Sequence, residues 1–293
     1  MLNAEQRADF EKWGVVKLRR AFTAEQAASM CDVMWRELQR RYGIEHHDRT
    51  TWDRHPPTGL KSSKKSHTFA PTLGPVVRDA LDDLFGADGW APPKHYGQVL
   101  VTMPNAKEWR VPHKLWHGDF QYTVPADDLF VVKVWSVLAD LPAGGGGTPQ
   151  LAGSHKLVAR FIEDRRGDQL EYKRTRDSFL ASHPALKALT TDADDTHRNE
   201  RFMQAFDVDG LPARVIEVSG EPGDVFITHP WVMHSIAVNA NTEPRMMRSM
   251  AVYRTGFLTG GRGAARGCGD DTESHEDETA PLPPRPATIG ARS

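Results

Sequence analysis

Polar and apolar positions near the start of the chain predict two helices with a strand between them. Asn3 and Thr23 are each followed three residues later by glutamine. This is the spacing of a capping box, in which side chains satisfy free N–H groups at a helix start. From about residue 23 to 42, apolar side chains recur every three or four positions, which predicts a helix packed on a sheet. The β-branched run at 14–18 predicts the intervening strand.

Beyond Tyr96 the pattern changes to short β-like runs, spaced as in an all-β sandwich or barrel. We predict strands at Gln98–Thr102, Phe130–Leu138, Ala213–Val218, Asp224–Thr228 and Met247–Tyr253. The charged stretch from Lys156 to Leu211 is too long for an ordinary connection, and it predicts a partly helical insertion or lid. Residues 258–293 are rich in Gly, Pro and acidic residues and predict a disordered tail. We therefore expect one catalytic domain, residues 1–257, with a lid or insertion at 156–211.

The composition argues against nucleic-acid-binding, membrane-spanning and disulfide-rich proteins. With 37 basic and 39 acidic residues, the formal net charge is -2, so no global field attracts nucleic acid or an anionic membrane. No stretch approaches the roughly 20 apolar residues of a membrane span, and the first ten residues lack the apolar core of a signal peptide. The two cysteines, Cys31 and Cys268, form neither a disulfide framework nor a thiolate metal site. We expect a cytoplasmic protein without nucleic-acid or membrane partners.

Three residues have the chemistry of one metal site. His117 and Asp119 are two positions apart, and a strand projects residues at this spacing to the same side. Such a pair by itself is more often an ordinary surface or core feature. His234, which ends a turn and strand beginning at Pro222, supplies a third ligand. Two imidazoles and a carboxylate on one face of an octahedron leave the opposite face open for a co-substrate and O2, which suits non-haem Fe(II).

Four separated segments follow one another in the order typical of a known family: Phe10 to Thr23, Trp116 to Asp119, Gly153 to Lys156, and Pro222 to His234. In this combination the chain resembles the phytanoyl-CoA dioxygenase-like family of Fe(II)/2-oxoglutarate-dependent oxygenases. The resemblance covers most of the chain from Phe10 to Tyr253. It leaves the 156–211 region and the tail without a counterpart.

The resemblance implies a mainly β fold with flanking helices around a double-stranded β-helix, a cupin-like jelly-roll. It also implies that His117, Asp119 and His234 bind Fe(II), with 2-oxoglutarate and O2 as co-substrates. The expected reaction is hydroxylation of a small-molecule metabolite or natural-product intermediate, with release of succinate and CO2. Related halogenases replace the carboxylate ligand with a small residue, so the presence of Asp119 disfavours halogenation.

Four further residues are candidates for binding 2-oxoglutarate. In the family, an arginine about one strand length beyond the second histidine holds the distal carboxylate, and Arg245 occupies the matching position. Arg248 competes, but three residues further along a strand it should point to the opposite face. Trp135 matches a family tryptophan near this pocket. Thr102 and Gln98 could bind a carboxylate if their strand faces the pocket, which depends on its register.

Other features suggest alternatives or structural roles. A cupin-like hydrolase or isomerase could use the same ligands with zinc or manganese, although the sequence nominates no general base for a catalytic zinc. A non-enzymatic jelly-roll binding module is a third hypothesis. The glycine run 144–147 lacks the lysine and spacing of a phosphate loop and predicts a flexible turn. We expect structural roles for His155 and His229, and selectivity to depend on the 156–211 insertion.

Overall fold

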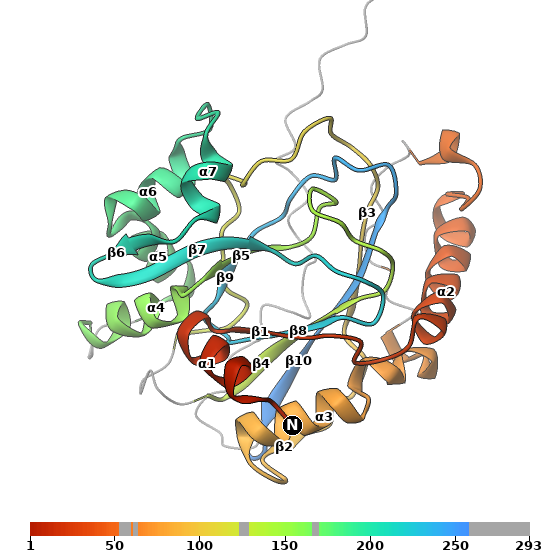
Figure 1. Ribbon diagram of the computed structural model, residues 1–293, viewed down its shortest axis with the longest axis horizontal. Helices are drawn as coiled ribbons and strands as arrows, with labels where there is room; N and C mark the ends of the chain where they lie inside the picture. Colours follow the sequence, from red (N-terminus) through yellow and green to blue (C-terminus); the bar gives the residue numbers. More distant parts are fainter. Residues whose placement is uncertain (53–59, 61–63, 123–128, 166–169, 258–293) are drawn as a thin grey trace, which may run out of the picture.

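The computed structural model describes residues 1–52, 60, 64–122, 129–165 and 170–257. Two antiparallel sheets form its centre (Figure 1). The larger sheet has the order β1 (Val15–Leu18), β8 (Val225–Thr228), β4 (Val131–Val137), β10 (Arg245–Arg254) and β2 (Trp90–Ala91), with β3 (Gln98–Thr102) also paired to β10. The smaller sheet has the order β6 (Phe206–Val208), β7 (Leu211–Glu217), β5 (Pro149–Ala152) and β9 (Met233–His234). The predicted β fold with flanking helices is confirmed, whereas the predicted tail at 258–293 lies outside the described residues.

The N-terminal helices begin where the capping patterns predict. Helix α1 (Ala4–Trp13) follows Asn3 and α2 (Ala24–Tyr42) follows Thr23, and both capping boxes are complete. Gly14 ends α1 in the left-handed region, with φ of 69°, which is accessible to glycine at little cost. The predicted strand follows immediately as β1.

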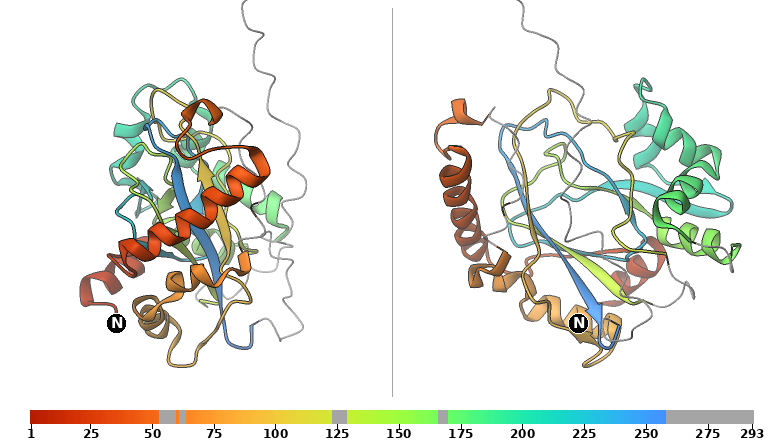
Figure 2. Two further views of the ribbon diagram at one scale, coloured as in Figure 1. Left: turned by 90° about the vertical axis from the view of Figure 1, so that its right-hand side faces the viewer. Right: turned by 180° about the vertical axis from the view of Figure 1, so that it is seen from behind.

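Helices cover the outer face of the larger sheet (Figures 1 and 2). The apolar stripe of α2 is buried in one core cluster with outward-facing residues of β4 and β8, such as Val134 and Ile227. Helix α3 (Pro75–Phe85) and the 3-10 helix η3 (His67–Leu73) contribute to the same cluster, and a second 3-10 helix, η1 (Arg49–Thr51), follows α2. This layer fixes the back of the sheet whose opposite face carries the candidate site.

The predicted insertion is helical. It contains α4 (Ser154–Glu163), α5 (Tyr172–Ala181), α6 (Pro184–Thr191) and α7 (Arg198–Met203). These helices pack against the outward side chains of the smaller sheet, among them Leu151, Val215 and Met233 (Figure 1). The insertion thus forms an outer layer behind β5, β7 and β9, and its effect on substrate choice stays a prediction.

The facing sides of the two sheets enclose a separate interior cluster. Trp135 and Val137 of β4 lie in this cluster, while Val132 and Val134 face the helices, as the two-residue period of a strand requires. Met247 of β10 also faces the interior. None of the helices in the described parts of the chain has the length and apolar character needed to cross a bilayer. The cytoplasmic location stays a prediction.

Candidate metal centre

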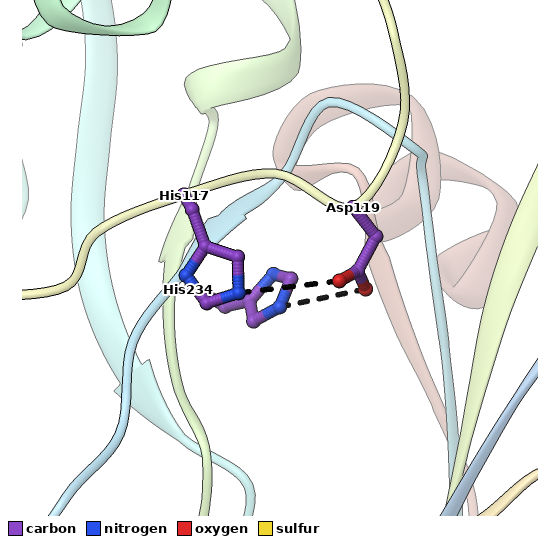
Figure 3. Close-up of side chains that lie close together, drawn as sticks. All are labelled: His117, Asp119 and His234. Atoms are coloured by element: carbon purple, nitrogen blue, oxygen red, sulfur yellow. Dashed lines mark ion pairs between the residues drawn. The ribbon is translucent and has the colours of Figure 1, made fainter. Parts of the chain in front are cut away.

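His117, Asp119 and His234 converge at one end of the interior. Each offers a ligand atom, and these atoms all lie within 4.8 Å of one another. The Nε2 atom of His234 is 3.5 Å from Asp119 Oδ2, and that of His117 is 4.0 Å from Asp119 Oδ1 (Figure 3). Two ligands each about 2.1 Å from a shared ion at a right angle are about 3 Å apart, so small movements would close the site around one metal.

The two histidines are held by a backbone bridge. His117 N donates to His234 O at 2.9 Å, and His234 N donates to His117 O at 2.8 Å. His234 belongs to β9, but His117 lies on an irregular segment with this single bridge, so the predicted strand for His117 and Asp119 is wrong. Leu115 has φ of 60°, which interrupts an extended chain just before the ligands. The two side chains nevertheless reach the same site.

Backbone carbonyls determine which imidazole nitrogens face Asp119. Nδ1 of His117 lies 2.7 Å from Leu115 O, and Nδ1 of His234 lies 3.4 Å from Val232 O. A carbonyl only accepts, so each Nδ1 carries the proton and each Nε2 is left as an unprotonated acceptor. Burial lowers the pKa of His117 to about 4, which keeps this imidazole neutral.

Lys133 provides a counter-charge for Asp119. Burial alone would raise the pKa of Asp119, but the Lys133 ammonium holds it well below its usual range. The Lys133 ammonium contacts Asp119 Oδ2 directly, and it lies 5.0 Å from the centre of the Trp135 ring. Lys133 was not among the site residues predicted from the sequence. It could have been noticed as a cation at an inward position of the otherwise apolar run 130–138.

The donor set fits a divalent cation. Two Nε2 acceptors and a deprotonated carboxylate all present lone pairs to one point, an arrangement that repels unless a cation lies between them. Lys133 engages Asp119 from the side and leaves the other carboxylate oxygen, Oδ1, free for a metal. Two nitrogens and one oxygen are the ligands preferred by non-haem Fe(II), and zinc accepts them too.

The candidates for co-substrate binding lie on the inward face of the larger sheet. Trp135 is buried, donates from Nε1 to Thr228 Oγ1 at 3.0 Å, and meets the His234 ring edge-on at 5.2 Å between centroids. On β10, Arg245 pairs with Thr102 and Ser249 pairs with Gln98. Paired residues on antiparallel strands share a face. Thr102 and Gln98 therefore point to the same side as Arg245, which the sequence did not determine.

Arg245 and Arg248 of β10 point in opposite directions, as predicted. Arg245 is buried on the interior side; its Nη1 donates to Gly146 O at 2.8 Å, and its Nε has no partner among the residues that the structure describes. Burial lowers the pKa of Arg245 to about 10, so the guanidinium stays charged at neutral pH. Arg248 instead donates to the carbonyls of Tyr96 and Gly97 and lies 3.7 Å from the Phe69 ring centre, among the outer-layer residues.

Comparison with known proteins identifies the family. The family model described as phytanoyl-CoA dioxygenase (PhyH) matches residues 10–247. The chain belongs to the phytanoyl-CoA dioxygenase family. No curated protein matches it significantly.

Solved structures similar to this PhyH-family chain include the non-heme alpha ketoglutarate dependent carbocyclase SnoK from nogalamycin biosynthesis. SnoK is 18% identical, with a TM-score of 0.50, and the match covers 86% of this chain and 84% of SnoK. HygX from Streptomyces hygroscopicus, solved with nickel and 2-oxoglutarate bound, is 17% identical with a TM-score of 0.48 and coverage of 88% of each chain. At 18% identity, the likeness to SnoK supports the jelly-roll fold only.

In this PhyH-family chain the glycine run is an ordered turn around a buried carboxylate. Glu217 accepts from Gly144 N at 2.8 Å and from Gly147 N at 3.0 Å. Burial raises the pKa of Glu217, and the surrounding amides counteract this rise. Gly146 has φ of 80°, and a Cβ on Gly147 would lie 2.0 Å from Val218 O. The turn thereby directs Gly146 O toward Arg245, a role that the prediction of a flexible turn did not include.

His155 and His229 lie away from the metal ligands. His155 Nε2 lies 3.2 Å from Glu11 O, and the His155 and His229 rings are 5.0 Å apart. Burial lowers the pKa of both histidines, to about 4 for His155. In the part of the chain that the structure describes, the cluster that could hold a metal contains neither of them. Their structural roles stay a prediction.

Proposed function

We propose that this chain is an Fe(II)- and 2-oxoglutarate-dependent dioxygenase that hydroxylates a small-molecule metabolite or natural-product intermediate, releasing succinate and CO2. The proposal is supported by the convergence of three lone-pair donors, His117, Asp119 and His234, in an interior that also contains a buried arginine, Arg245, whose Nε has no partner among the described residues. A metal hydrolase needs the three metal ligands, but its reaction does not require the arginine.

Each residue would have its own role in binding the metal or 2-oxoglutarate. His117, Asp119 and His234 would hold Fe(II), and Arg245 would bind the distal carboxylate of 2-oxoglutarate through its planar donors. Trp135, which is buried edge-on against the His234 ring, would help to exclude water from the ligand cluster. Fe(II), once bound with 2-oxoglutarate and O2, supplies the oxidising chemistry. Thr102 and Gln98 share the face of Arg245 and are further candidates for co-substrate contacts.

Exposed apolar side chains beside the metal ligands indicate a substrate with an apolar body. Leu115 is 65% exposed, Ile236 60% and Val238 40%, three of the five large hydrophobic residues classed as exposed in the described parts of the chain. Leu115 and Ile236 are each two residues from a histidine of the backbone bridge. Exposed apolar groups gathered at a site usually mark a binding surface. We infer that this rim receives the substrate.

Changing Leu115 to asparagine should weaken binding of an apolar probe, because it removes apolar surface from the rim. Asparagine tolerates a positive φ, so the fold should be retained. We expect a several-fold loss of 8-anilinonaphthalene-1-sulfonate binding, measured by fluorescence titration of the metal-free protein. Val76→Thr is the control, since Val76 is also exposed but lies on α3. If Leu115→Asn and the wild type bind the dye with equal affinity, the rim is not the binding surface for apolar ligands.

The proposed cofactor pair can be tested by anaerobic titration. Adding Fe(II) and then 2-oxoglutarate to metal-free protein should produce the weak visible charge-transfer band of the chelate. In Arg245→Ala the 2-oxoglutarate concentration for half-maximal band intensity should rise at least tenfold, because a buried charge-assisted pair is lost. Arg254→Ala is the matched control, since Arg254 is an exposed arginine on the same strand.

The outcomes separate the competing functions. A band that requires both additions and weakens in Arg245→Ala supports the dioxygenase. If iron binds but no band forms, a hydrolase or isomerase with the same ligands becomes the better explanation. If the wild type binds no metal, the non-enzymatic binding module is favoured. The reaction type needs a substrate: SnoK, with its similar fold, is named a carbocyclase, so ring closure is the principal alternative to hydroxylation.

A further inference from the structure

Gln150 is a polar side chain that the described part of the chain leaves without a hydrogen-bond partner. It lies on β5 with no exposed surface, and neither its Oε1 nor its Nε2 has a hydrogen-bond partner. Buried amides are nearly always hydrogen-bonded, because leaving them unpaired destabilises the folded state. An unpartnered buried glutamine therefore calls for a ligand that pairs with it.

The pairing of β5 directs Gln150 toward the metal centre. In the smaller sheet Gln150 lies opposite His234 on one side and opposite Ile216 on the other. Directly opposite residues of antiparallel strands share a face, and the His234 ring points to the interior. The neighbouring Leu151 is buried with the helices of the outer layer, which confirms the opposite direction for Gln150.

The glycine run just before Gln150 contacts Arg245. Strand β5 begins just after the glycine run, whose Gly146 carbonyl accepts from Arg245 Nη1 at 2.8 Å. Arg245 Nε is another buried donor that has no partner in the described ranges of the chain. Among the described residues, Gln150 and Arg245 are thus two buried side chains of the interior with unsatisfied polar atoms, and one of them is cationic. A carboxylate accepts several hydrogen bonds, so it can pair with both.

We propose that Gln150 is a co-substrate-binding residue whose amide N–H donates to the distal carboxylate of 2-oxoglutarate beside Arg245. This inference rests on the proposed function, since it assumes that 2-oxoglutarate extends from the metal toward Arg245. Gln150 Oε1 then accepts from a water that bridges it to the bound ligand. Glu217 supports the arrangement by fixing the turn that holds Arg245.

The test exploits opposite effects on folding and binding. Gln150→Leu removes the unpaired polar atoms at similar volume, so the metal-free protein should unfold about 2–4 °C higher than the wild type. Its Kd for 2-oxoglutarate should rise about tenfold, measured by calorimetry on protein loaded with Fe(II) without oxygen. Its affinity for Fe(II) alone should not change, because Gln150 is not a metal ligand. Gln39→Leu, an exposed glutamine on α2, should change neither constant.

The outcomes distinguish this inference from the proposed function. If the wild type binds Fe(II) but no 2-oxoglutarate, the proposed function itself fails. If the wild type binds both and Gln150→Leu binds 2-oxoglutarate equally well, only the role of Gln150 is overturned. A Gln150→Leu protein that is less stable than the wild type would show that the amide serves the fold, and this too would overturn the proposal. Higher stability with weaker 2-oxoglutarate binding is the result we expect.

Discussion

Changing Asp119 to alanine is expected to abolish Fe(II) binding and 2-oxoglutarate turnover and to destabilise the metal-free protein. The ligand set would lose its only carboxylate, and two neutral imidazoles bind Fe(II) far more weakly. The Lys133 ammonium would also lose the carboxylate that it contacts in a mostly buried position. Breaking such a pair from one side costs about 2–4 kcal/mol of unfolding free energy. Equilibrium dialysis with Fe(II) and urea unfolding measure the two effects.

A double variant separates the two roles of Asp119. Asp119→Ala with Lys133→Met removes both charges, so it should recover most of the lost stability while Fe(II) binding remains absent. Asp209→Asn is the control, because Asp209 is an exposed carboxylate that lies 3.7 Å from Arg160, and asparagine tolerates its positive φ. Fe(II) binding by Asp119→Ala with wild-type affinity would contradict the assignment of the ligands. Unchanged stability in that variant would contradict the pairing with Lys133.

Changing Arg198 to methionine should lower the unfolding free energy by about 3–5 kcal/mol, since several carbonyls would lose a charged donor in a buried position. Arg198 is buried on α7, and its partners in the described part of the chain are all backbone carbonyls. Its Nε donates to Val111 O at 2.8 Å and its Nη2 to Pro112 O at 3.0 Å. Further bonds reach the end of α6, at Leu189 O and Asp192 O, each at 2.7 Å. Urea unfolding of the metal-free protein measures the loss.

Arg201 on the same helix provides the matched comparison. It is exposed and pairs with Asp192 and Asp195 at 3.0 and 3.4 Å, so Arg201→Met should cost less than about 1 kcal/mol. Equal losses in the two variants would show that the buried carbonyl bonds of Arg198 add nothing. The comparison also concerns function, because the segment that contains Val111 and Pro112 leads to His117. We expect Fe(II) affinity to fall in Arg198→Met and to stay unchanged in Arg201→Met.

The helices of the predicted insertion contact the segment that carries the candidate metal ligands. Besides the bonds of Arg198, the Tyr172 hydroxyl on α5 donates to the carbonyl of Gly118, which lies between two of the ligands. Asn199 Oδ1 on α7 accepts from Val111 N at 2.8 Å. These contacts indicate that the insertion positions the ligand segment. Any effect of these helices on substrate choice would be a second role, separate from this structural one.

The sequence alone was sufficient for features that depend on near neighbours. Both capping boxes formed as predicted, because the groups that pair are three residues apart. Strand β3 has the predicted bounds, and β4, β7, β8 and β10 lie within two residues of theirs. The opposite directions of Arg245 and Arg248 follow from the two-residue period of a strand. The short strands β5 and β9 were not predicted, because four and two residues carry too little pattern.

Other features were decided only by the tertiary structure, since they join segments far apart in the chain. The pairing of β3 with β10 placed Gln98 and Thr102 on the face of Arg245. The contact of Lys133 with Asp119 and the closure of the glycine turn around Glu217 likewise depend on strand register and on packing between the sheets. A local pattern shows which face of an element is apolar. Which distant side chains meet across the interior is settled when the two sheets pack together.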